Sequence, residues 1–185
     1  MVFLIGRKLT HSYSVMIHEM FGKYEYKNAE LEPDQLDSFM RSGEWDALNV
    51  TIPYKIEVMK YCDEISQQAQ DIGSVNTVVR RDGKIYGYNT DYFGLAACLE
   101  RHGIDCKGKK VLVLGSGGTS KVARCVASDM GASSVTVISR SGEDNYENIS
   151  RHRDAGVIIN TTPVGMFPDN GQKPLSLSGF DNLSG

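Results

Sequence analysis

The sequence predicts an α/β fold, because short β-branched runs alternate with helical segments along its 185 residues. One segment sharpens this prediction. Residues 110–114 (Lys-Val-Leu-Val-Leu) suit a strand that is buried on both faces, and Gly-Ser-Gly-Gly follows at once. Helical residues then run from Thr119 to Met130. A strand, a glycine-rich turn and a helix in this order are typical of dinucleotide-binding folds, where the free amides of the helix start bind a pyrophosphate.

Residues 1–100 are predicted to form a first α/β unit. Asp82-Gly83 is the dipeptide preferred in tight hairpins, so the runs on either side of it are expected to pair. Pro53 suits the first turn of a helix that follows a strand. The expected strands are 2–6, 24–29, 47–51, 75–81 and 84–88, and the expected helices are 14–21, 33–42, 55–62, 63–71 and 91–102.

Residues 101–185 are predicted to form the second unit, with the boundary near residue 100. The polar, glycine-bearing segment 103–109 leads into this unit. Three strands are expected in it, at 111–115, 134–139 and 157–160. A doubly wound fold has two βαβ halves in the strand order 3-2-1-4-5-6, and three strands account for one half. The sequence therefore predicts an incomplete Rossmann-like domain.

The composition excludes several classes of protein. The net charge of −3 provides no basic face for nucleic acid, and no apolar run approaches the ~20 residues of a membrane span. No signal peptide precedes the first apolar run, and the cysteines have no CxxC spacing, so we expect a cytoplasmic protein with reduced thiols. No metal site is expected, because the histidines are not grouped; they are His11, His18, His102 and His152.

The end of the second strand of this domain favours NADP over NAD. Gly115 and Gly117 fit the first two positions of G-x-G-x-x-G, although Ser120 occupies the third and the glycines alone also fit any tight turn. NAD-binding folds usually place an acid about 20 residues later, whereas this chain has Arg140 between two serines. A guanidinium suits a 2′-phosphate, although a solvated surface arginine is the alternative. Glu143 and Asp144 follow shortly after and keep NAD open.

Two side chains of the first unit suit acid–base chemistry. Lys55 follows Pro53 in a predicted first helical turn, where a cation gains nothing from the helix dipole. Asp91 precedes a helical run, so a plain N-cap is the alternative to a functional role. Together they would pass a proton to or from a substrate hydroxyl while hydride moves to a nicotinamide.

Six groups of residues follow one another along nearly the whole chain. They are Gly6 with His11-Ser12-Tyr13-Ser14; Asn49-Val50-Thr51-Ile52-Pro53-Tyr54-Lys55; Ile72-Gly73-Ser74-Val75-Asn76-Thr77; Gly87-Tyr88-Asn89-Thr90-Asp91 with Gly94; Gly115-Ser116-Gly117-Gly118; and Asn160-Thr161-Thr162-Pro163-Val164-Gly165-Met166. In these motifs the sequence resembles the shikimate dehydrogenase family, whose members interconvert 3-dehydroshikimate and shikimate with NADP in the shikimate pathway of chorismate and aromatic amino acid biosynthesis. The resemblance implies an N-terminal α/β substrate domain followed by an incomplete Rossmann-like NADP-binding domain.

The resemblance also implies a role for each candidate residue. The substrate carboxylate would bind Ser12 and Ser14, and Thr51, Asn76 and Asp91 would hold the ring hydroxyls. Lys55 and Asp91 would be the catalytic pair. The residues implied at the NADP site are Gly115, Gly117, Gly118 and Thr119 at the pyrophosphate, Ser139, Arg140 and Ser141 at the 2′-phosphate, and Thr161, Thr162 and Met166 at the nicotinamide.

The sequence departs from the family pattern at several positions, and none of them removes a catalytic group. Val15 replaces a usual proline, Tyr54 replaces a usual histidine, and Ser74 and Ser120 stand where small apolar residues are common. The segment 140–160 lacks the second basic residue that some relatives use on the 2′-phosphate.

The resemblance further implies that the family's C-terminal segment is missing after Gly185. We therefore expect Val111 to Gly115 to become an unpaired sheet edge, with self-association through that edge and weak or absent turnover. Two alternatives stay open. One is a quinate/shikimate dehydrogenase of broader specificity, and the other is a non-catalytic module that binds shikimate and nucleotide.

Overall fold

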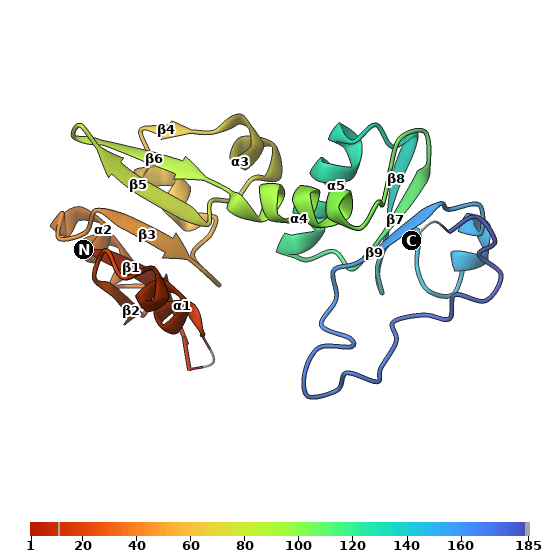
Figure 1. The fold of residues 1–185 in the computed structure, drawn as a ribbon, viewed down its shortest axis with the longest axis horizontal. Helices are drawn as coiled ribbons and strands as arrows, with labels where there is room; N and C mark the ends of the chain where they lie inside the picture. Colours follow the sequence, from red (N-terminus) through yellow and green to blue (C-terminus); the bar gives the residue numbers. More distant parts are fainter. Residues whose placement is uncertain (11, 184–185) are drawn as a thin grey trace. The chain divides into compact units, whose positions relative to one another are not determined.

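The computed structural model describes residues 1–10 and 12–183, so His11 of the first predicted motif lies outside the described residues. The chain divides into two compact units, one ending at Thr90 and one beginning at Asp91 (Figure 1). Each unit has its own sheet. The division falls at the start of helix α4 (Thr90–Arg101), whereas the sequence placed the boundary at the end of that helix.

The first unit is a six-stranded mixed sheet in the order β2-β1-β3-β5-β6-β4. Strands β1, β2 and β3 are parallel to one another, β5 runs antiparallel to β3 and β6, and β4 pairs in parallel with β6. Its elements are β1 (Val2–Gly6), α1 (Ser14–Phe21), β2 (Tyr26–Glu30), α2 (Leu36–Ser42), β3 (Ala47–Val50), the 3-10 helix η1 (Glu57–Tyr61), β4 (Glu64–Ile65), α3 (Gln67–Ile72), β5 (Thr77–Arg81) and β6 (Lys84–Tyr88).

The predicted hairpin is confirmed. Strands β5 and β6 are joined by Asp82 and Gly83, with φ of 51° and 76°. Two successive positive φ values define the turn whose twist matches paired strands, and Asp-Gly is well suited to it. The strand faces bury a core around Trp45, Leu48 and Val78, each at most 1% exposed. This core fixes the positions of the loops at the ends of the strands.

The prediction of two helices over 55–62 and 63–71 is wrong in its details. The carbonyl of Lys55 accepts the backbone N–H of Val75 at 2.8 Å, so an α-helix does not form there and only the 3-10 turn η1 follows. The backbone N–H of Asp63 donates to the carbonyl of Ile85 at 2.8 Å, which draws the next residues into the sheet as β4. Helix α3 begins only after Ser66, whose side chain caps it.

The second unit contains a three-stranded parallel sheet in the order β8-β7-β9. Helix α5 connects β7 to β8, and η2 precedes β9 (Figure 1). No helix among the described residues is both long enough and apolar enough to cross a membrane. The elements are α4, β7 (Lys110–Leu114), α5 (Gly118–Asp129), β8 (Ser134–Ile138), the 3-10 helix η2 (Ile149–His152) and β9 (Val157–Asn160).

The expectation that the first strand of this sheet becomes an edge is wrong. After β8 the chain crosses to the far side of β7, and β9 pairs with β7 from Val111 opposite Val157 to Leu114 opposite Asn160. Strand β7 is therefore central, and residues 111–114 are at most 1% exposed. The edges of this sheet are β8 and β9.

Candidate functional site

The candidate residues of the first unit gather at one end of its sheet. Strands β1 and β3 run parallel with Ile5 opposite Val50, so the loops after both strands leave from the same end. Strand β5 starts at this end and β6 finishes there, because Thr77 lies opposite both Asn49 and Tyr88. The sequence-predicted residues placed in these loops or strand ends are Ser12, Ser14, Thr51, Lys55 and Asn76.

Asn76 is the best-defined of these side chains. It is 8% exposed, and its Oδ1 accepts the backbone N–H of Thr90 at 2.9 Å and the Thr90 hydroxyl at 3.2 Å. The Thr77 hydroxyl donates to the same oxygen at 3.0 Å. Oδ1 is thus fully engaged, and the amide N–H groups make no hydrogen bond to the described residues. Asn76 therefore has donors available for a ligand.

Thr51 is held by close packing at the end of β3. Its backbone N–H donates to the carbonyl of Ile5 at 2.9 Å. A Cβ placed on Gly6 would approach the Thr51 methyl carbon to 2.6 Å, so only glycine fits where β1 passes Thr51. The glycine of the first motif thus sets the position of the threonine.

Ser12 lies in the turn before α1, and Ser14 is the first residue of that helix. The Ser12 hydroxyl oxygen accepts the backbone N–H of Ser14 at 3.2 Å. Burial raises the pKa of Tyr26 above its ordinary value, and a side-chain hydrogen bond with Ser14 opposes that rise. The Tyr26 hydroxyl also donates to Oδ1 of Asn49 at 2.8 Å. The Ser14 side chain therefore lies beside Tyr26 of β2, whose hydroxyl in turn contacts Asn49 of β3.

The structure places Lys55 and Asp91 on separate elements. Lys55 is half-buried in the turn before η1 and is fixed through its backbone carbonyl. Asp91 lies in the first turn of α4, one residue after the helix begins, so its N-cap interpretation is wrong. A carboxylate is favoured there by the helix dipole. Because the two residues belong to different compact units, their catalytic pairing stays a prediction.

A cavity of about 490 Å³ opens at the carboxyl ends of the parallel strands of the second unit. The loop after each of the three strands contributes to its wall. Because β8 and β9 lie on opposite sides of β7, the cavity is at a topological switch point, where open α/β sheets bind their ligands. The lining residues are Gly115, Ser116, Gly117, Ser139, Arg140, Tyr146, Thr161, Thr162, Pro163, Val164 and Pro174.

The glycines of this cavity have different roles. Gly115 has φ of 101°, and a Cβ there would lie 3.0 Å from the Thr162 methyl carbon, so this position requires glycine. At Gly117 and Gly118 a Cβ would meet no atom within 4 Å. Gly117 precedes α5, and no side chain caps that helix. The open space and the uncapped helix start suit a pyrophosphate. Gly118 and Thr119 contribute first-turn positions without lining the cavity.

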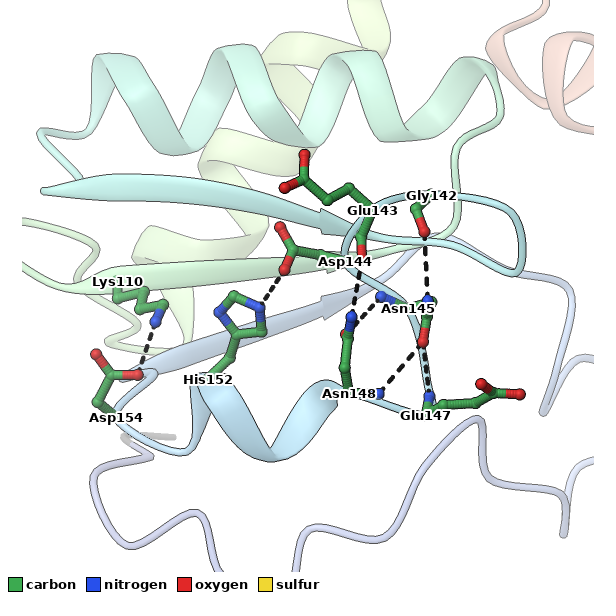
Figure 2. A network of polar contacts seen from close by, with 9 residues as sticks. All are labelled: Lys110, Gly142, Glu143, Asp144, Asn145, Glu147, Asn148, His152 and Asp154. Carbon is green, nitrogen blue, oxygen red and sulfur yellow. Dashed lines mark hydrogen bonds and ion pairs between the residues drawn. The ribbon is translucent and has the colours of Figure 1, made fainter.

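Arg140 lines the cavity as an exposed cation. Its guanidinium makes no hydrogen bond or ion pair with the described residues, so it is available to an anion. The two nearby acids do not line the cavity. Asp144 instead accepts a hydrogen bond from Nε2 of His152 at 2.7 Å (Figure 2). Ser139 lines the cavity beside Arg140, whereas Ser141 does not.

The loop after β9 is organised by a residue to which the sequence assigned no role. Oδ1 of Asn160 accepts both the backbone N–H and the hydroxyl of Thr162, at 3.0 and 2.7 Å, and Nδ2 donates to the carbonyl of Val164 at 3.0 Å. The Thr161 hydroxyl donates to the carbonyl of Leu114 at 2.6 Å. Met166 is 64% exposed and does not line the cavity.

Comparison with known proteins gives consistent matches along the chain. The family model described as "Shikimate dehydrogenase substrate binding domain" matches residues 4–78. A shikimate dehydrogenase (NADP(+)) of Clostridium beijerinckii is 36% identical over 201 residues, covering 98% of this chain and 74% of the relative. A second, from Caldicellulosiruptor bescii, is 35% identical and covers 97% of this chain and 71% of the relative.

Solved structures give the same picture. The crystal structure of a chorismate mutase/shikimate 5-dehydrogenase fusion protein from Clostridium acetobutylicum has a TM-score of 0.87 at 35% identity, covering 99% of this chain and 74% of that one. A shikimate 5-dehydrogenase from Thermus thermophilus, in complex with NADP(H) and shikimate, has a TM-score of 0.81 at 28% identity, with coverages of 97% and 74%. The chain thus spans about three quarters of the length of these proteins.

Proposed function

Because the chain belongs to the shikimate dehydrogenase family, we propose that it catalyses reversible hydride transfer between NADPH and 3-dehydroshikimate, giving shikimate. One observation carries this proposal: relatives named shikimate dehydrogenase (NADP(+)) match 97–98% of the chain, across both units. The two candidate sites described above support it, since each unit gathers the residue types that its ligand requires.

The substrate is proposed to bind at the end of the six-stranded sheet. Shikimate is a small acid with several hydroxyls, so its site needs convergent hydrogen-bonding groups. The hydroxyls of Ser12 and Ser14 suit the carboxylate, and Thr51 and the amide N–H groups of Asn76 suit the ring hydroxyls. A site built to bond a hydroxyl strongly rejects analogues that lack it.

NADP is proposed to bind in the cavity of the second unit, with the 2′-phosphate on Arg140. The open space above Gly117 and Gly118 and the unpartnered guanidinium of Arg140 fit this group. Bound NADP supplies the nicotinamide that accepts or gives the hydride. Its proposed binding residues are Gly115, Gly117, Gly118, Thr119, Ser139, Arg140, Ser141, Thr161, Thr162 and Met166; of these, Met166 is supported by the resemblance alone.

Lys55 and Asp91 are proposed to manage the proton. Oxidation of the alcohol removes a proton from the hydroxyl oxygen, and reduction of the ketone returns it to that oxygen. An amine and a carboxylate that both contact this oxygen can accept or supply the proton in either direction. The proposal requires that Lys55 and Asp91 both reach the reacting hydroxyl when substrate is bound.

An assay with the purified chain tests the function. Weak NADPH formation from shikimate and NADP is expected, with a still lower rate when NAD replaces NADP. Quinate in place of shikimate tests the broader-specificity alternative. Calorimetry with shikimate and NADP is run in parallel, and binding of both ligands without turnover would instead support the non-catalytic module. Absence of both binding and turnover would contradict the proposal.

We also propose self-association and a cytoplasmic location. Among the described strands β9 pairs only with β7, so its outer edge offers backbone groups to a second copy of the chain. Light scattering over a range of concentrations tests this, and a clean monomer at high concentration would contradict it. None of the four cysteines, all of which lie within the described residues, forms a disulfide, as expected in a reducing compartment.

A further inference from the structure

The loop after β8 carries an acid that does not line the cavity and is hydrogen-bonded to a buried histidine. His152 is 9% exposed, and its Nε2 lies 2.7 Å from Oδ1 of Asp144 (Figure 2). A carboxylate only accepts hydrogen bonds, so Nε2 carries the proton in this pair. Nδ1 of His152 is buried and has no partner among the described residues. Asp144 is therefore the polar partner of this ring within the described part of the chain.

Asp144 is five positions beyond Ser139 in sequence, yet it lies beside the end of β8. Its backbone carbonyl accepts the backbone N–H of Ser139 at 3.2 Å, so the loop folds back on itself. A Cβ on Gly142 would approach the Ser139 hydroxyl to 2.7 Å, which shows how tightly the loop closes. The fold thus returns a carboxylate to the strand end where NAD-binding folds carry their acid.

The rest of the loop is held by side-chain bonds that do not involve Asp144. Oδ1 of Asn145 accepts the backbone N–H groups of Glu147 and Asn148, at 2.9 and 3.2 Å. Oδ1 of Asn148 accepts the backbone N–H of Asn145 at 2.9 Å, and its Nδ2 donates to the carbonyl of Glu143 at 2.8 Å (Figure 2). The loop backbone therefore has its own supports, and the bond from His152 fixes the direction of one side chain.

We propose that His152 is a specificity-determining residue, which sets the preference for NADP by holding the Asp144 carboxylate away from the cavity. This inference rests on the proposed function. The neighbours of Asp144 on both sides of the loop, Arg140 and Tyr146, line the cavity. A carboxylate released toward them neutralises Arg140, repels a 2′-phosphate and accepts a hydrogen bond from the 2′-hydroxyl of NAD. His152 prevents this.

The test compares the Kd values of NADP and NAD for the full chain by calorimetry. His152→Leu introduces an apolar side chain of similar size and removes the hydrogen-bond donor. We expect it to lower the ratio of the NAD Kd to the NADP Kd by about tenfold or more. In the double variant His152→Leu with Asp144→Asn, the ratio is expected to return to within about threefold of the wild-type value. A purely structural role for His152 does not predict this restoration.

Controls separate the outcomes. His152→Gln retains a hydrogen-bond donor. Lys110→Met breaks the 2.7 Å ion pair with Asp154, which lies in the same unit but outside the loop. Both variants are expected to leave the ratio unchanged. An unchanged ratio in folded His152→Leu, or no restoration in the double variant, overturns the inference.

If His152→Leu does not fold, the single variant Asp144→Asn decides. An unchanged ratio of the two Kd values in that variant supports the inference, and a tenfold rise overturns it. Wild-type protein that binds neither nucleotide overturns the proposed function as well.

Discussion

Oδ1 of Asn76 accepts hydrogen bonds from both the backbone N–H and the hydroxyl of Thr90, at 2.9 and 3.2 Å. These bonds join the residue before β5 to the first residue of α4. Because Asp91 follows Thr90, Asn76 fixes the start of the helix that carries the proposed catalytic carboxylate. One side chain thereby has a structural oxygen and a nitrogen proposed to bind substrate.

Replacing Asn76 separates these two roles. Asn76→Ala removes a cap, so the free energy of unfolding is expected to fall by about 1 kcal/mol, and the KM for shikimate is expected to rise. Asn76→Asp keeps the acceptor oxygen but loses the amide N–H groups. Urea unfolding should therefore show near-native stability for Asn76→Asp, while its KM rises as in Asn76→Ala. A normal KM in both variants would remove Asn76 from the substrate site.

Lys55 is expected to act in the chemical step. Lys55→Ala should lower kcat by about 10²-fold or more, with a change in KM of less than about threefold, because the lost group acts in the transition state. Steady-state assays with shikimate and NADP measure both constants. Lys60→Ala is the matched control, since Lys60 is a second lysine of this segment whose ammonium lies over the Tyr61 ring. An unaltered kcat in Lys55→Ala would exclude Lys55 from the mechanism.

Arg140 is expected to recognise the 2′-phosphate alone. Arg140→Ala should raise the Kd of NADP by about tenfold or more and change that of NAD by less than about threefold, because NAD lacks the phosphate. Calorimetry with each nucleotide measures the two values. Arg124→Ala, at an exposed position on α5, removes the same charge elsewhere in the unit and serves as the comparison. Equal weakening of both nucleotides would argue against a phosphate contact.

The Cys62 thiol is expected to react slowly with alkylating reagents in the folded protein. Burial raises its pKa from 9.0 to about 11, and the negative charge of Asp63 contributes to the rise. Only the thiolate alkylates readily, so iodoacetamide should label Cys62 slowly near pH 8 and faster as the pH approaches 11. Mass spectrometry compares it with the exposed Cys98.

The same shift predicts a change of stability with pH. The folded-state pKa of Cys62 lies above the unfolded value, so its contribution to stability is complete below about pH 9 and is lost as the pH rises through about 11. Urea unfolding of the wild type and of Cys62→Ala across this range measures the contribution. Labelling of folded Cys62 as fast as of Cys98 near pH 8 would contradict the protected thiol.

Elements with strong local signals were predicted from the sequence with accurate bounds. Helix α1, strands β1, β6 and β9, and the Asp82-Gly83 turn all fall where the local pattern places them. Residues 55–71 were not predicted well, because their conformation is decided by bonds to distant strands. The Lys55 carbonyl is engaged by Val75, and Asp63 is drawn to Ile85. Helical periodicity carries no information about such partners.

The cavity was predicted in part. Its glycines and Arg140 stand out in sequence because they follow strands at characteristic spacing. Tyr146 was missed because it reaches the wall only through the folding back of its loop, which no local pattern indicates. Asn160 carried a usable signal, since asparagine at a strand end often bonds the backbone two residues on. The sequence also did not predict on which side of β7 strand β9 pairs, because counting the strands gives their number but not their order in the sheet.

The passage of the chain from β8 across β7 to β9 gives the cavity two walls of separate origin. Segment 139–148 forms one wall and 160–166 contributes to the other, and each is braced by its own asparagines. In the proposed NADP site, the residues expected to distinguish NADP from NAD thus all lie in one of these walls, the segment 139–148. Substitutions in segment 139–148 can therefore change the preferred nucleotide while the conformation of segment 160–166 is retained.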